Sequence, residues 1–482
     1  MEPIVSHQSP VINHRSRGSS LAARCVVACL LIAAPLKSGA QDLPERMGLS
    51  QAIDFAVKHS ALIGAARAGT DVLEAKLKQA EWAAWPHIKL KSLLAPMPRQ
   101  WNDPNDYTKG GTDLSEWGVF TYTEISGVLP LYTFGKISNL KAAARLGVDV
   151  GKAREAVARE EVVFRVKRSF YAMALARELA DVVKEGRGYL DKARTHLDEL
   201  EKDDDPSFDP VDRMKLRVYD AKVLARELEA VRSVDLARSA VRVAMGLPPE
   251  DAMDFVVGDV KPEEVRREFS EKELVERAVE ARAELRALRA GIRVREAQVE
   301  MRKSAFYPDF YLAGQFKYGY TKMAQGQTNP FLYDPYNSYS AGGGLALEWD
   351  LEIGRKLGEL REAKANLAKL KADEREAENG IRLQVAKLYR EMRDARRLVD
   401  AQKRALEAAR GWVIAKTDLY ENDLADLRDV MDGLVAFFQS RIDYLQSVYA
   451  FNLAVAQLER STGVSLLGAA RGSERPSAGP GE

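Results

Sequence analysis

The spacing of hydrophobic residues predicts long helices in two parts of this chain. Apolar residues recur every three or four positions over about 136–246 and 354–463, as in amphipathic and coiled-coil helices. A helix of about 65 residues is about 100 Å long, since each residue adds about 1.5 Å. Turns at 201–210 and 421–426 divide each stretch, so we predict two long helical hairpins. The seam of the second hairpin comprises Ile381, Val385, Leu388, Met392, Ala395 and Val399 going out, and Phe438, Ile442, Leu445, Tyr449, Asn452 and Ala456 returning.

The pattern alternates with a period of two residues ahead of each hairpin, which predicts β-strands. In the clearest strand, apolar Phe316 and Tyr318 alternate with polar Gln315 and Lys317. An apolar, aromatic face on alternate residues is typical of barrel strands that face lipid. The connections at about 96–117 and 321–338 are rich in Asn, Asp, Pro, Gly and Tyr, and are expected to be exposed loops. The predicted strands are about 86–95, 119–131, 308–320 and 339–351.

The same succession of segments occurs twice. An amphipathic helix, 49–84 or 270–305, opens each copy, and the pattern of 56–86 recurs at 278–308 with a constant interval between matching residues. So long a period indicates a duplicated domain and not a solenoid. The predicted organisation is a signal peptide at 1–40, repeat 1 at 48–247, an inter-repeat linker at 248–269, repeat 2 at 270–466 and a disordered tail at 467–482.

The N-terminus has the features of a secretory signal. Arginines precede an apolar stretch of about twelve residues, and Ser38-Gly39-Ala40 suits signal peptidase. The stretch is shorter than the roughly 20 residues of a spanning helix, so cleavage is favoured over an anchor. Both cysteines, Cys25 and Cys29, lie in this segment. The mature chain therefore has no thiol for a disulfide or a thiolate metal site.

Composition argues against nucleic-acid binding and against catalysis. There are 72 basic and 71 acidic residues, so no net charge favours a nucleic acid partner. The five histidines are isolated in the sequence and show no metal-ligand spacing. We predict no enzymatic activity, no cofactor and no metal site.

Three segments together resemble the TolC family of outer-membrane efflux proteins, and the resemblance covers residues 48–466. The segments are the helix ending at Tyr307-Pro308, the strand-to-helix junction at 349–355, and the stretch 420–463. The resemblance implies a mainly α fold with a small membrane β part. It implies a homotrimer whose subunits each give four strands to a twelve-stranded barrel and long helices to a periplasmic tunnel.

The same resemblance implies a function and partners. The trimer is expected to be the outer-membrane exit duct of a tripartite efflux or type I secretion system. Its partners are then outer-membrane lipid, a periplasmic adaptor and an inner-membrane transporter. Drug, metal, lipid and protein export all fit such a duct. Two open sheet edges would also leave backbone groups unsatisfied in lipid, so physical chemistry independently favours closure by oligomerisation.

The candidate functional residues lie near the turn of the second hairpin. Asp429 and Asp432 are three apart on a helix and share a face; by resemblance they form carboxylate rings at the periplasmic entrance, which attract cations. The alternative is a solvated helix start, where the dipole favours Asp. Tyr420 matches a tyrosine that latches the closed entrance, and Arg428 is a second latch candidate.

The hairpin tips are also where the family meets its adaptor. Candidate docking residues are Asp212, Asp423 and Asp426. The sequence departs from the family here, because Asp423 and Ala425 stand where a glycine and an arginine are common. The acidic turn 201–210 is either an ordinary solvated loop or a rim that docks the adaptor or attracts cations.

Heptads alone would favour a soluble helical bundle, so a competing class remains. A periplasmic coiled-coil adaptor or scaffold would bind partners without forming a pore. Adaptors have one helical hairpin flanked by separate β domains, whereas this sequence predicts two hairpins with strands only between helices. The strands and the signal favour the channel.

Overall fold

The computed structural model describes most of the chain after the predicted signal. Every described residue belongs to one compact unit, Glu45–Glu482, and only that unit is considered below. The predicted signal, Asp423 and the tail after residue 467 lie outside the described residues. The described residues are 46–103, 106–205, 208–266, 268–326, 334–422 and 424–467.

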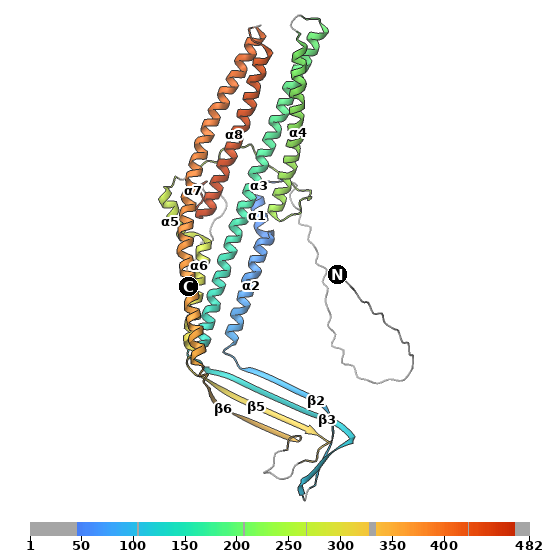
Figure 1. Cartoon of the computed structure of the whole chain (residues 1–482), viewed down its shortest axis with the longest axis vertical. Helices are drawn as coiled ribbons and strands as arrows, with labels where there is room; N and C mark the ends of the chain where they lie inside the picture. Colours follow the sequence, from blue (N-terminus) through green and yellow to red (C-terminus); the bar gives the residue numbers. More distant parts are fainter. Residues whose placement is uncertain are drawn as a thin grey trace, which may run out of the picture. The chain divides into compact units, whose positions relative to one another are not determined.

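The unit is mainly helical, which confirms the predicted fold class at that level, and its elements occur in the same order twice (Figure 1). A two-residue strand precedes the first series and another follows it: β1 (Arg46–Met47) and β4 (Asp254–Phe255). The first series comprises α1 (Leu49–His59), α2 (Ala61–Trp82), β2 (His87–Asp103), β3 (Asp106–Tyr132), α3 (Lys136–Lys202) and α4 (Pro210–Met245). The second comprises α5 (Glu271–Ala281), α6 (Ala283–Ser304), β5 (Asp309–Thr321), β6 (Ser338–Glu348), α7 (Ile353–Glu421) and α8 (Leu427–Thr462).

Each opening helix is divided where one continuous helix was expected. Ser60 separates α1 from α2, and Arg282 separates α5 from α6; both residues have extended backbone. Each short helix buries part of its apolar face in a core cluster, through Ala52 and Ala56 of α1 and Leu274 and Ala278 of α5. Both helices of each pair contact the same long helix, α3 or α7, and the short helix also contacts the returning helix, α4 or α8.

The four long strands form one antiparallel sheet in the order β2-β3-β5-β6. The β2–β3 ladder runs through most of the predicted loop at 96–117, with register shifts at Pro98/Arg99 and Asn102/Asp103. Polar, glycine-rich composition suggested a loop there. Pairing of β2 with β3 nevertheless continues on both sides of each register shift, as far as Asp103 and Asp106.

The change from β3 to α3 depends on one glycine. Phe134 and Gly135 both have positive φ, 48° and 92°. A Cβ at Gly135 would lie 3.2 Å from Oγ of Ser304, so both space and backbone favour glycine. The Phe134 ring stacks on Tyr307 at 5.1 Å. This stack fixes the start of the long helix beside the start of β5.

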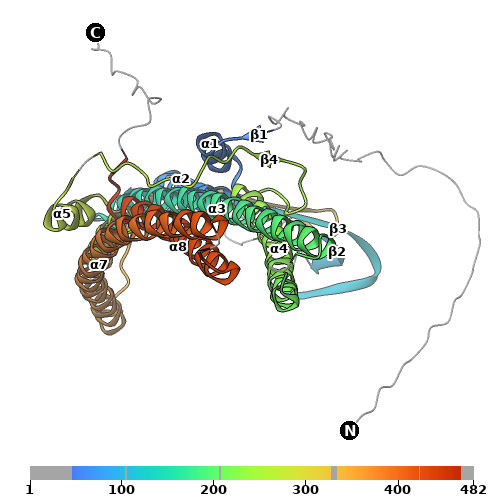
Figure 2. The same cartoon turned by 90° about the horizontal axis from the view of Figure 1, so that it is seen from above.

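The long helices form a curved row in the order α7, α8, α3, α4 (Figure 2). α8 contacts both α7 and α3, whereas α4 ends the row beside α3. One core cluster joins α1, α3 and α4, and a second joins α5, α7 and α8. The second includes the predicted seam residues Ile381, Val385, Leu388 and Val399, with Met392 and Ala395 packed against it.

Candidate functional site

One face of the sheet is apolar across all four strands. The register aligns Leu90, Ile125, Phe316 and Ala341 in a single row. The large side chains of this face are exposed, and Leu90 retains 69% of its accessible surface. Further exposed members of the same face are Ile88, Leu94, Leu312, Tyr318, Tyr339, Leu345 and Leu347. An exposed apolar surface of this extent on a folded protein marks a contact with a membrane or with another protein.

The opposite face of the sheet carries charged residues, together with exposed Leu93 and Val128. The next row aligns Lys91, Glu124, Lys317 and Ser340. Opposite charges on adjacent strands attract each other and so support the register. The hydroxyl of Tyr122 also donates to Glu124 at 3.1 Å. The charged residues of the sheet thus gather on the face opposite the apolar row.

Ionic contacts hold the sheet to the helices. Nζ of Lys136, in the first turn of α3, donates to Oδ2 of Asp309 at 2.8 Å and to the carbonyl of Tyr307 at 2.9 Å. At the second junction, Asp350 pairs with Arg355 at 2.9 Å, and Lys356 donates to the Asp350 carbonyl. These contacts tie the start of α3 to the start of β5, and the start of α7 to the segment that follows β6.

At the other end of the helices, the structure gives each predicted ring aspartate a cationic neighbour. Nζ of Lys416 on α7 lies 2.6 Å from Oδ2 of Asp429, whose side chain is 44% exposed. Asp432 is 54% exposed and lies 3.9 Å from Nε of Arg428. Lys416 was not among the residues predicted from the sequence. A signal was available, because Lys416 and Asp429 are almost equidistant from the turn and so face each other in an antiparallel hairpin.

Tyr420 lies against the first hairpin. Its hydroxyl is 3.4 Å from Nε2 of His196 on α3, and the two rings meet edge to face at 6.4 Å. His196 was also missed, and no local pattern could have indicated it, because the contact joins different repeats. The predicted latch residue is therefore placed at a contact between the two hairpins.

Arg428 and Asp212, predicted separately as latch and docking residues, line the same small cavity between the hairpin tips. Asp212 accepts a hydrogen bond from Lys215 at 2.7 Å, and this bond raises the pKa of Lys215. Met431 and Leu197 supply apolar walls. The cavity thus brings one cation of α8 close to an ion pair of α4.

The third docking candidate caps α8. Asp426 is the exposed N-cap residue, and its carbonyl accepts from the amide of Asp429 at 2.9 Å. In the first hairpin, the Asp209 carboxylate performs the capping by accepting from the amide of Val211 at 2.8 Å. Asp423 lies outside the described residues.

A series of contacts along α3 and α8 joins the hairpins below the tips. Near the base, Lys167 pairs with Glu459 at 2.7 Å and Arg460 with Glu161 at 2.6 Å. Glu459 is well protected, with 10% of its side chain exposed, and also accepts from the amide of Leu466. Further members of the series are the Arg441–Glu185 ion pair and the edge-to-face rings of Tyr189 and Phe438. The joint is most protected at its base.

The described residues contain no group of three or more His, Cys, Asp or Glu side chains placed to hold a metal ion. None of their helices combines the length and the apolar character needed to cross a membrane.

Comparison with known proteins gives a family for the second half of the chain and a fold for the whole unit. Residues 274–464 match the outer membrane efflux protein family, a family of channel proteins and not of enzymes. No curated protein matches the chain by sequence.

Three solved structures share the fold. A membrane protein from Pseudomonas aeruginosa has a TM-score of 0.70 and 16% identity, covering 86% of this chain and 93% of that one. The outer membrane protein VceC from Vibrio cholerae has a TM-score of 0.68 and 18% identity, covering 87% and 96%. The Campylobacter jejuni CmeC outer membrane channel has a TM-score of 0.70 and 13% identity, covering 86% and 85%.

Proposed function

Because this chain carries an outer membrane efflux protein domain and is a protein of the outer membrane, we propose that it is the passive exit duct of a tripartite efflux or type I secretion system. An inner-membrane transporter delivers the substrate through a periplasmic adaptor. The duct opens at its helical end and lets the substrate diffuse out. Its own residues supply a path and a gate, and no chemical step.

The observation that carries the proposal is the two-faced sheet. Exposed Leu90, Ile125 and Phe316 form a row on one face, and Lys91, Glu124 and Lys317 form the neighbouring row on the other. A sheet with one face in hydrocarbon and the other in water needs this arrangement. A soluble scaffold has no use for it, since exposing so many large apolar side chains to water favours aggregation.

Closure requires further copies of the chain. β2 and β6 end the sheet, and each pairs with one described neighbour. In lipid, their outer backbone groups would lack hydrogen-bond partners. All neighbouring strands of this four-stranded sheet are antiparallel, so β6 runs opposite to β2. β6 of one subunit can therefore pair with β2 of the next in the same antiparallel pattern. We propose a homotrimer with a closed twelve-stranded barrel.

In this arrangement the hairpin tips form the periplasmic gate. Asp429 and Asp432 of three subunits supply the acidic ring, with Lys416 and Arg428 reducing its net charge. Tyr420 holds hairpin 2 against His196 in the closed state. Asp212, Asp426 and Asp423 are the proposed adaptor contacts.

Neighbouring residues of β5 provide a test of the two-faced sheet. Phe316→Cys and Lys317→Cys each introduce a single thiol, because the only native cysteines are Cys25 and Cys29 in the predicted signal. In outer-membrane preparations, a charged maleimide should label the Lys317→Cys variant and spare the Phe316→Cys variant. A lipid-soluble maleimide should label the Phe316→Cys variant. Equal labelling of both by the charged reagent, with the chain recovered as a soluble periplasmic monomer, would support the scaffold and reject the channel.

A further inference from the structure

A large cavity lies between the inter-repeat linker and α7, away from the sheet and the tips. It has a volume of about 870 Å³. Its floor is apolar and includes Leu274, Met392, Phe451 and Leu458. Three arginines of α7, Arg393, Arg396 and Arg397, form what we call the basic rim.

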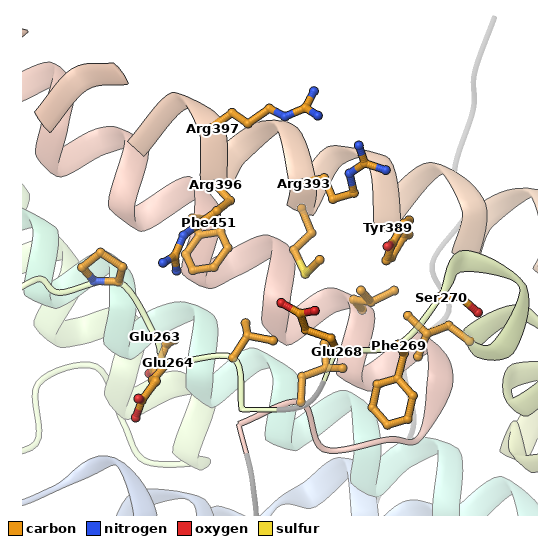
Figure 3. Close-up of a pocket in the computed structure, with 16 residues that line it drawn as sticks. Glu263, Glu264, Glu268, Phe269, Ser270, Tyr389, Arg393, Arg396, Arg397 and Phe451 are labelled. Carbon is orange, nitrogen blue, oxygen red and sulfur yellow. The ribbon is translucent and has the colours of Figure 1, made fainter. Parts of the chain in front are cut away.

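Glu263, Glu264 and Glu268 line the same cavity from the linker, so the charge of the basic rim is partly balanced on the side that faces the linker. Arg396 lies over the Phe451 ring at 5.4 Å, and Arg393 lies over Tyr389 at 5.9 Å. Among the described residues, the rim forms one ion pair, an exposed contact of 3.8 Å between Arg397 and Asp394. In Figure 3, Arg393 and Arg397 extend outwards from α7, while the Glu268 carboxylate points from the linker towards the helix. The outer side of the rim is available to an acidic partner.

The opposite end of the helical row has complementary properties. α4 exposes Leu228, Val231 and Leu236 at 67%, 63% and 70%, and these residues line a shallow groove together with Asp235. The Asp235 side chain is 67% exposed and its nearest cation, Arg238, is 3.4 Å away on the same helix. Figure 2 shows α4 and α7 at the two ends of the row.

The two surfaces lie within about two helical turns of each other along the helices. On one side, Arg396 contacts Phe451; the adjacent Asn452 and Tyr171 of α3 both hydrogen-bond to the linker at Glu263. Tyr171 therefore marks on α3 the level of the rim.

On α4, Val241 shares a core cluster with Phe170 and Met173 of α3, next to Tyr171. Leu236 and Asp235 precede Val241 on α4 by five and six residues, so they lie up to about 9 Å nearer the tip at 1.5 Å per residue. A cyclic assembly rotates a subunit without translating it along the axis, so surfaces that meet must share a level.

We propose that this cavity receives α4 of the neighbouring subunit, with Leu236 packed over its apolar edge and Asp235 paired to the basic rim. The inference rests on the proposed oligomeric channel and adds the residues of one seam. This contact also covers the exposed apolar face of α4. A closed trimer contains three such contacts, one for each α4.

Cross-linking tests the seam directly. In the Leu236→Cys/Arg393→Cys variant, a short bis-maleimide should link subunits into covalent trimers. The matched control is Leu236→Cys/Gly411→Cys. Gly411 is exposed, has room for a side chain, and lies on the same face of α7 about 27 Å nearer the tip. The control should give no cross-linked trimer.

Charge reversal tests the ion pairing. Asp235→Arg should raise the concentration at which the trimer half-dissociates by about tenfold or more, and adding Arg393→Asp should restore it. Glu229→Arg, on another face of α4, should have little effect.

The outcomes separate this seam from the channel proposal. If native trimers do not cross-link between positions 236 and 393, or if charge reversal leaves trimer dissociation unchanged, the seam is wrong and the channel proposal is unaffected. A wild-type chain that is monomeric in outer membranes would refute the channel itself. Protection of the Arg393→Cys thiol in isolated monomers as well as in trimers would assign the cavity to a segment of the same chain or to a bound anion, and would also overturn the seam.

Discussion

The two returning helices, α4 and α8, have the same length of 36 residues but very different surroundings. α4 buries Val241 and Met245 near its end and exposes apolar residues along most of its length. α8 lies between α7 and α3 and buries residues on two sides, including Leu445, Val448 and Phe451. Helices at matching places in the two halves therefore have different tasks: α8 holds the subunit together, and α4 presents a surface to a partner.

The largest expected difference between them concerns stability. Phe451→Ala should lower the free energy of unfolding of the subunit by about 3–5 kcal/mol, because it removes a buried aromatic ring and leaves a cavity. Leu228→Ala on α4 should change it by no more than about 0.5 kcal/mol, since that side chain is exposed. Urea unfolding followed by circular dichroism measures both. Equal effects would mean that α4 is packed as tightly as α8 within the subunit.

A smaller effect is expected at the contact between the hairpin tips. Tyr420→Phe removes the hydroxyl that meets His196, and a single hydrogen bond contributes about 0.5–1.5 kcal/mol. The open population in planar bilayers should therefore rise between about twofold and tenfold. Tyr389→Phe, on α7 and far from the tips, is the control. An unchanged open probability in Tyr420→Phe would remove this residue from the latch.

The charges of the second tip should affect ion selectivity. Asp429→Ala with Asp432→Ala should lower cation selectivity, and Lys416→Ala should raise it by releasing the Asp429 carboxylate. Reversal potentials under a salt gradient measure both. Shifts of the same sign in the two variants would contradict the ring, because the substitutions change the net charge in opposite directions.

The smallest expected effect is a difference between the two hairpins in how their stability depends on pH. In the first hairpin, Arg187 donates to Glu227 and Asp220, and the bond from Arg187 lowers the pKa of Glu227 below its ordinary value of 4.5. A lowered pKa means that the contribution to stability is present above that value and is lost as the pH falls through the folded-state pKa. Limited proteolysis should therefore nick the α3–α4 hairpin increasingly below about pH 4.5, with less change in α7–α8.

The control for the pH effect is Glu227→Gln. At neutral pH, protease should nick this variant as readily as it nicks the wild type at low pH, and acidification should change the variant little. Equal acid sensitivity of both hairpins in the wild type would point to general acid unfolding instead. The expected effect is small because the pair is partly exposed to solvent.

The sequence by itself determined the local pattern of this protein. Period-two alternation set which side chains share a face of each strand, as for Phe316 and Lys317, and heptad spacing indicated long helices with a buried seam. These features follow from backbone geometry, which repeats every two residues in a strand and every 3.6 in a helix. The resemblance to channel proteins depended on the order of such segments, and the family match at residues 274–464 confirms it for that part of the chain.

Only the tertiary structure decided which segments meet. It paired Tyr420 with His196 and placed Arg428 and Asp212 around the same cavity. It also divided the opening helices at Ser60 and Arg282. The contact pairs between hairpins join residues far apart in the chain, so no local period encodes them. The position of a helix in the row, and not its own sequence pattern, determines whether its apolar face is buried, as in α8, or left for a neighbour, as in α4.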